Sequence, residues 1–150
     1  MSSILDQTIG ILKKRFVLYI AVAAFLFLGD VVFHYTAVAI KPPLFSTKTW
    51  GYFMFVIALF SGVGVPIFLR SSFQRNAAKT GIAKLDGYQR LQSLLMFSVF
   101  ISCIASDIAY FFPVQTFYLY GAFFSCLYGI YSVIPYRKKI AAEMKFYKLI

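Results

Sequence analysis

The chain has 150 residues, of which 61% are hydrophobic and 13% are charged, and its formal net charge is +10. This length is enough for one domain. Soluble domains contain about 45–50% apolar and about 25% charged residues, so the composition excludes an ordinary water-soluble domain. Because the basic residues fall between apolar runs, we expect their partners to be anionic lipid headgroups and exclude nucleic acid.

Four apolar segments are each long enough to cross a bilayer as a helix, which takes about 20 residues. In chain order they cover residues 16–37, 50–69, 91–112 and 114–136. Membrane strands would alternate apolar and polar residues, and these segments do not. The predicted fold class is therefore all-α: an integral membrane four-helix bundle that forms a single domain over residues 1–150. Since the joins after the first and third segments are short, we expect two antiparallel transmembrane hairpins.

The positions of the basic residues predict how the segments cross the membrane. Of the 15 Lys and Arg residues, only Lys41 and Lys48 lie between the first and second segments, and none lies between the third and fourth. Positive charge in short loops stays on the cytoplasmic side. We therefore predict that both termini and a loop at 70–90 are cytoplasmic. Because the chain is short and has no long loops, we expect a multi-pass protein of a bacterial cytoplasmic membrane.

The segments that flank the four spans are amphipathic. Residues 3–12 and 138–150 mix polar or basic side chains with large apolar ones, so we expect both ends to lie on the membrane surface. The 70–90 loop carries Phe73 and Tyr88, and it is either a solvated basic loop or a helix on the bilayer or on a partner. The basic residues predicted to contact anionic headgroups are Lys13, Lys14, Arg15, Arg70, Arg75, Arg137, Lys138 and Lys139.

Small residues recur at helical spacing in three of the spans. Helices in lipid associate through small residues that allow close approach, so these stripes predict helix contacts. A ligand groove lined by small residues is the alternative. The stripes consist of Ala58 and Gly62, of Ser98, Ser102 and Ser106, and of Gly121, Ser125 and Gly129. The two cysteines, Cys103 and Cys126, form no CxxC motif and are interpreted as packing residues rather than zinc ligands.

Two acids lie inside apolar spans, where a charge is costly. Asp30 and Asp107 both precede the outer end of their span by one to two turns, and His34 shares a helix face with Asp30. Tyr35, Tyr110 and Gln115 could add hydrogen bonds to the same group. One interpretation is an outward-facing site for a proton, a cation or a substrate. The other is a structural cluster that fixes helix register or binds a neighbouring subunit. A metal site is not predicted, because so few ligands are present.

No catalytic motif accompanies these residues. The sequence has no HExxH, P-loop or GxSxG motif, and its single histidine does not suit a haem held by two histidines. No cofactor is predicted, and an enzyme is not favoured. Two hypotheses remain. The first is a non-catalytic accessory or scaffold subunit that binds other membrane proteins or itself. The second is a small transporter or ion-binding protein that uses Asp30, His34 and Asp107.

Overall fold

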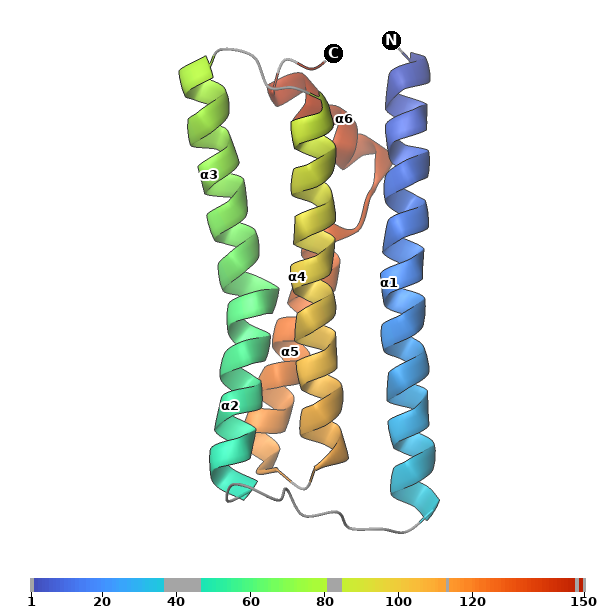
Figure 1. Cartoon of the computed structure of the whole chain (residues 1–150), viewed down its shortest axis with the longest axis vertical. Coiled ribbons are helices and arrows are strands. Elements are labelled where there is room, and N and C mark those ends of the chain that lie inside the picture. The colour runs from blue at the N-terminus through green and yellow to red at the C-terminus, as the bar shows by residue number, and fades with distance from the viewer. Residues whose placement is uncertain (1, 37–46, 81–84, 113, 148, 150) are drawn as a thin grey trace.

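The computed structural model describes residues 2–36, 47–80, 85–112, 114–147 and 149, and these residues form helices and turns with no strand. The elements are α1 (Ser2–Thr36), α2 (Thr47–Leu59), the π-helical η1 (Phe60–Gly64), α3 (Val65–Thr80), α4 (Leu85–Phe111), α5 (Thr116–Val133) and α6 (Arg137–Phe146). Helices α2, η1 and α3 follow one another without a break (Figure 1). The all-α part of the predicted fold class is therefore confirmed.

Within the part of the chain that the structure describes, three continuous helices are long and apolar enough to cross a membrane: Ile4–Phe33, Lys48–Ala77 and Leu85–Phe111. A fourth crossing is reached if α5 and α6, which meet at a bend of 69°, count as one span. These lengths and compositions are consistent with an integral membrane protein.

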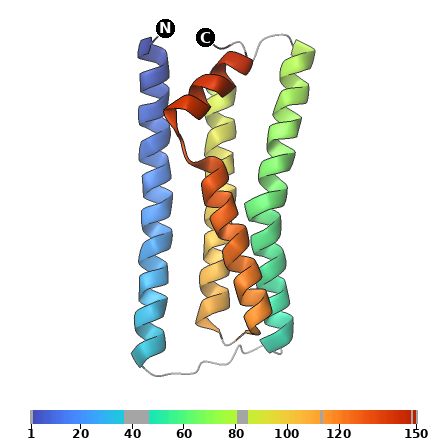
Figure 2. The same cartoon turned by 180° about the vertical axis from the view of Figure 1, so that it is seen from behind.

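Successive long helices run in alternating directions (Figure 1). The start of α1, the end of α3, the start of α4 and all of α6 gather at one end of the molecule, which we call the basic end (Figures 1 and 2). The chain termini lie at this same end. Arg70 of α3 and Lys139 of α6 belong to elements of this half, whereas the start of α2 lies at the opposite end.

Helix α4 is the centre of the packing. α1 packs against α4 and α6, whereas α2 packs against α4 and α5. α1 and α2 consequently lie on opposite sides of α4 (Figures 1 and 2). The helices of the first predicted hairpin are therefore not packed together as the second pair, α4 and α5, is. The reason is that α4 has two different faces. Its small residues pack against α2 and α5, whereas its larger side chains pack against α1.

The 70–90 segment, for which the sequence left both a solvated loop and a surface helix open, is helical where the structure describes it. α3 continues to Thr80 and α4 begins at Leu85. The apolar side chains of this segment explain the extension, because they give both helices something to pack against outside the spans. Tyr88 is fully buried, and the ring of Phe73 lies 5.0 Å from that of Tyr147.

Both ends of the chain pack onto the molecule itself, where the sequence suggested that they lie on the membrane surface. α1 is one helix from Ser2 to Thr36, and its Leu12 is fully buried. In α6, Ile140 is 1% exposed and Met144 is fully buried in the same apolar cluster. Part of the apolar face of each end therefore contacts protein, while Ile4, Ile11 and Phe146 stay exposed.

Two prolines shape the helices. Pro135 ends α5, since the preceding Ile134 has the extended conformation (φ −53°, ψ 125°) that residues before proline prefer. Pro66 has no N–H group for the carbonyl of Gly62, its α-helical partner four residues earlier. The π-helical turn η1 lies over this position, as such turns often do where the regular ladder is interrupted.

Candidate functional sites

The predicted small residues meet where α2 and η1, α4 and α5 pack. An added Cβ at Gly62 would lie 2.6 Å from both the Ser102 hydroxyl and the Ser125 carbonyl oxygen. At Gly129 it would lie 3.1 Å from the Gly62 carbonyl oxygen, and at Gly121 it would lie 2.5 Å from the Phe55 ring. The backbones therefore approach so closely that a methyl group does not fit at Gly62 without movement.

The serine hydroxyls of the same interface bind carbonyl oxygens. Ser102 donates to Ala58 O at 2.8 Å, which joins α4 to α2. Ser106 donates to Ser102 O at 2.9 Å and to Ala122 O at 3.0 Å, which joins α4 to α5. Ser98 and Ser125 bond carbonyls of their own helices. The structure thus places Ser102, Ser106 and Ser125 in helix contacts, whereas Ser98 also lines an apolar cleft of about 530 Å³ along α2, α3 and α4.

Cys103 of α4 and Cys126 of α5 belong to the same packing layer. Both are buried free thiols, and their sulfur atoms are 2.8 Å apart. Within the described residues, no group of three or more His, Cys, Asp and Glu side chains converges as a metal site would require.

The two intramembrane acids come together between α1 and α4. Asp107 is 7% exposed, and its Oδ2 atom has no hydrogen-bond partner among the described residues. Asp30 of α1 is half-buried and close enough for the two carboxyl groups to interact electrostatically. Buried polar atoms are normally hydrogen-bonded, so this Asp107 oxygen calls for an explanation.

The other residues predicted for this cluster differ in burial and position. Tyr110 is half-buried, and its ring lies 5.4 Å from that of Phe27. Tyr35 is 84% exposed, and Gln115 is exposed before the first turn of α5. The side chain of His34 lies outside the described residues. The structure therefore gathers Asp30, Asp107 and Tyr110 along one interface and leaves Tyr35 and Gln115 at the surface.

At the basic end, the carboxylate of Glu143 on α6 accepts two hydrogen bonds from α4. Glu143 Oε2 accepts hydrogen bonds from the Tyr88 hydroxyl and from Gln92 Nε2, both at 2.7 Å. Tyr88 and Gln92 lie one turn apart on α4 and are buried. This network was not predicted from the sequence. Its one signal there is the i, i+4 spacing of Tyr88 and Gln92 near the start of α4.

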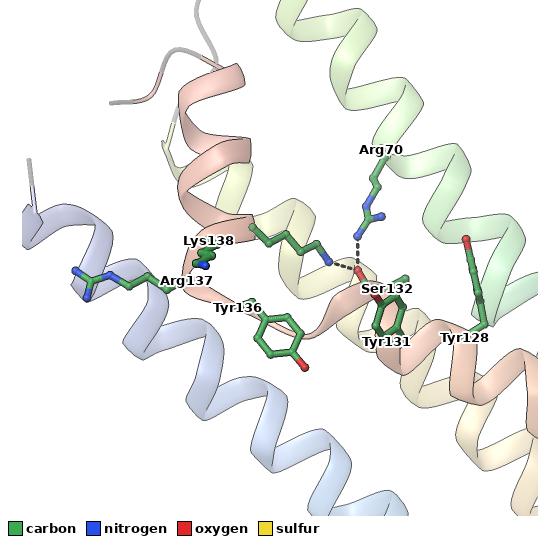
Figure 3. Close-up of a pocket in the computed structure, with 8 residues that line it drawn as sticks. Arg70, Tyr128, Tyr131, Ser132, Tyr136, Arg137 and Lys138 are labelled. Carbon is green, nitrogen blue, oxygen red and sulfur yellow. Dashed lines mark hydrogen bonds between the residues drawn. The ribbon is translucent and has the colours of Figure 1, made fainter.

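A second group at the basic end collects positive charge. The carbonyl oxygen of Ser132, in the last turn of α5, accepts hydrogen bonds from Arg70 of α3 at 2.5 Å and from Lys139 of α6 (Figure 3). These residues line a cleft of about 630 Å³. The remaining lining side chains are Tyr128, Tyr131, Tyr136, Arg137 and Lys138.

The cleft is electrostatically unbalanced. Burial lowers the pKa of Lys139 below the usual 10.5, and the nearby Arg70 guanidinium lowers it further. Glu143 opposes this shift, but its effect on the lysine pKa is smaller than that of Arg70. Two cations thus share one neutral carbonyl oxygen, an arrangement that an anion would stabilise.

The other predicted headgroup contacts are spread over the basic end. Arg15 donates to the Ser93 hydroxyl, and Arg137 forms an ion pair with Asp6 at 3.1 Å. The side chains of Lys13, Lys14, Arg75 and Lys138 are exposed. Of the eight predicted residues, four line the cleft of Figure 3, and their meeting there depends on the bend after α5.

Comparison with known proteins adds no relative: no family model, curated protein or solved structure matches this chain.

Proposed function

We propose that this chain is a non-catalytic four-span integral membrane protein that serves as an accessory or scaffold subunit of a larger membrane assembly. In this proposal α1, the helix from α2 to α3, α4 and α5 are the four spans. Both termini and the segment between α3 and α4 are cytoplasmic. The gathering of the termini, α6 and most basic groups at one end supports this orientation, since short cytoplasmic segments are rich in Lys and Arg.

The observation that carries the scaffold proposal is the way the interior small residues are used. Ser102 and Ser106 donate hydrogen bonds to neighbouring helices, and Gly62 lies against α5 with no room for a methyl group. The interface between α2, α4 and α5 is therefore occupied by protein. A partner would therefore bind an outer surface of the helices.

The outside of α1 is the surface we assign to that partner. Only 6% of the residues in its apolar stretch are buried, against 56% in α4. Its exposed side chains include Val17, Phe25 and Val32, which are 62%, 75% and 62% exposed. Asp30 lies half-buried on this same helix, and a second membrane helix would shield it from lipid better than acyl chains would.

A photoreactive amino acid at residue 25 tests this proposal in native membranes. The matched control is the same residue at position 124 of α5, because Phe25 and Phe124 are 75% and 70% exposed. We expect a discrete protein adduct from position 25 and lipid adducts from position 124. An adduct of twice the chain mass would identify the partner as a second copy. Lipid adducts alone at both positions would contradict the proposal.

A second candidate function is binding of a proton or a cation by Asp30 and Asp107, together with His34 as the sequence suggested. It is favoured by one observation, the buried Asp107 Oδ2 atom without a hydrogen-bond partner. A cation, a proton or a water molecule would satisfy that atom.

Asparagine variants separate the two functions. If the acids bind an ion, purified protein in sealed vesicles should move protons or cations, and Asp30→Asn or Asp107→Asn should abolish the flux. The scaffold proposal expects no flux above that of empty vesicles. It also expects an unchanged adduct from position 25 in Asp107→Asn, because that acid faces into the molecule at 7% exposure.

A further inference from the structure

The geometry points to a specific phospholipid site at the basic end: the cleft between α3, α5 and α6 binds the phosphate of an anionic lipid headgroup through Arg70 and Lys139. This inference deepens the proposed function, since it rests on the basic end lying at the cytoplasmic membrane surface. The sequence predicted only a general attraction of basic residues for anionic lipid, whereas the inference assigns one site with Arg70 and Lys139 as donors.

The first support is the convergence of two cations from different helices. Arg70 comes from α3 and Lys139 from α6, yet both reach the carbonyl oxygen of Ser132 (Figure 3). That oxygen has two lone pairs and carries no charge. Both side chains keep further N–H groups for a second acceptor, because a guanidinium has five and an ammonium three.

The second support is the sign of the charge around the cleft. Its described lining has four cationic side chains and no acid. Arg137 is paired with Asp6, and Glu143 is used by Tyr88 and Gln92. No acid of the lining balances the other three cations, and Glu143 outside the cleft offsets the charge of Lys139 only in part. Burial lowers the pKa of Lys139, and the nearness of Arg70 lowers it further.

The third support is the position and shape of the cleft. It lies where α5 ends and the chain bends by 69° into α6, the level at which a lipid headgroup would sit if α5 spans the bilayer. Tyr128, Tyr131 and Tyr136 line it and are exposed. Tyrosine is favoured at this level of a membrane, where its ring meets acyl chains and its hydroxyl meets phosphate. A volume of about 630 Å³ is ample for a phosphate and part of its glycerol.

The donor set also selects among anionic lipids. Two neighbouring cations that share one neutral acceptor match a headgroup with two negative charges better than one with a single charge. We therefore expect the cleft to prefer a phosphomonoester lipid, phosphatidate, over phosphatidylglycerol, and both over the zwitterionic phosphatidylcholine.

Native mass spectrometry of the full-length protein, released from vesicles that contain these three lipids in equal amounts, tests the inference. Retained phosphatidate should exceed retained phosphatidylglycerol, and phosphatidylcholine should be displaced. In Arg70→Gln and Lys139→Gln, phosphatidate binding should weaken about tenfold, because each change removes a charged hydrogen-bond donor. Equal retention of the three lipids by the unchanged protein would overturn the inference.

The matched controls are Arg75→Gln on α3 and Lys145→Gln on α6. Each removes one positive charge from the same helix at an exposed position outside the cleft. We expect both to bind phosphatidate within twofold of the unchanged protein. If they weaken binding as much as the cleft variants do, the attraction is a diffuse effect of net charge and the specific site is wrong.

Thermal unfolding of the unchanged protein keeps the test decisive if a glutamine variant fails to fold. Phosphatidate should raise the melting temperature, since a ligand that binds only the folded state stabilises it. Inorganic phosphate at the same concentration should not. An equal rise with inorganic phosphate would identify a soluble phosphate as the ligand and overturn the assignment to lipid.

Failure here and failure of the proposed function are distinguishable. Lipid binding reports on the α3, α5 and α6 cleft, whereas the adduct at position 25 reports on the outside of α1. Loss of lipid selectivity with an intact protein adduct would remove only the headgroup site. The opposite result would remove only the scaffold function.

Discussion

Helix α4 contacts its neighbours in two different ways. Towards α2 and α5 it presents small residues, and the contact is made by glycines, serine hydroxyls and backbone carbonyls. Towards α1 it presents rings, such as Phe97 and Phe100 against Tyr19 at 6.3 and 5.5 Å. We call these contacts the small-residue side and the aromatic side. Chain order would pair α1 with α2, but close backbone approach instead favours the α2, α4 and α5 group.

The difference teaches which contacts hold the molecule together in lipid. Burial of apolar surface gives little driving force when the solvent is itself apolar, so packing and hydrogen bonds decide. The small-residue side has both. The aromatic side has ring contacts that bury little of α1, and the two acids that meet there repel each other when both are charged. We therefore expect α1 to be the more easily displaced helix.

A methyl group should have opposite effects on glycines in the two regions. Gly62→Ala places a Cβ 2.6 Å from the Ser125 carbonyl oxygen, so we expect it to lower the free energy of unfolding by about 2–3 kcal/mol. Gly29→Ala on α1 meets no atom within 4 Å and should be neutral or stabilising by up to about 1 kcal/mol. Unfolding in mixed detergent micelles measures both. Equal losses would mean that the small-residue side is not specially close-packed.

Glu143→Ala tests the network that ties α6 to α4 at the basic end. It leaves the buried Tyr88 hydroxyl and Gln92 amide without their carboxylate acceptor, which should cost about 2 kcal/mol. Glu143→Gln keeps an acceptor oxygen and should lose less than half as much. The same micelle unfolding assay compares the two, and equal losses from both changes would show that the hydrogen bonds contribute little.

Phe27→Ala tests the aromatic side. The Phe27 ring lies 5.4 Å from Tyr110 and 5.8 Å from Phe123, so the change removes two ring contacts of α1. Lipid can replace much of the lost contact, and we expect a loss of about 1 kcal/mol. The control is Phe25→Ala, whose ring is 75% exposed and whose loss should change nothing measurable. A loss as large as that of Gly62→Ala would remove the distinction between the two sides.

Lys139→Met is expected to have the smallest effect on stability, and the size of that effect depends on pH. The folded-state pKa of Lys139 is lowered below 10.5, so just below that pH the unfolded chain binds more protons. Stability of the unchanged protein, relative to Lys139→Met, should therefore rise as pH increases towards 10.5 in lipid-free micelles. A flat difference between the two unfolding curves would show that the cleft does not penalise the charged lysine.

The helical class and the long apolar segments were predictable, because the length of each apolar run in the sequence indicates a helix that can cross a membrane. The small-residue stripes were visible as well, since helical spacing puts Gly121 and Gly129 on one face. The neighbours of each helix were not predictable. They depend on which stripe meets which, and short connections suggested the α1–α2 pair that the structure separates.

The ends of the chain show a second limit of sequence. An apolar face looks the same whether lipid or protein will cover it, and Leu12 and Met144 were assigned to the membrane surface although both are fully buried in protein. The cleft was missed for a related reason. Arg70 and Lys139 are 69 positions apart in the sequence, and only the bend at Pro135 brings them to one carbonyl oxygen.

The most direct test of the account is a measurement of which side of the membrane each end faces. Single cysteines replace Lys48 at one end and Lys145 at the basic end, both exposed, in a chain without Cys103 and Cys126. A membrane-impermeant maleimide is then applied to intact cells and to opened membranes. The account predicts labelling of position 48 in intact cells and of position 145 only after opening. Labelling of position 145 in intact cells would contradict it.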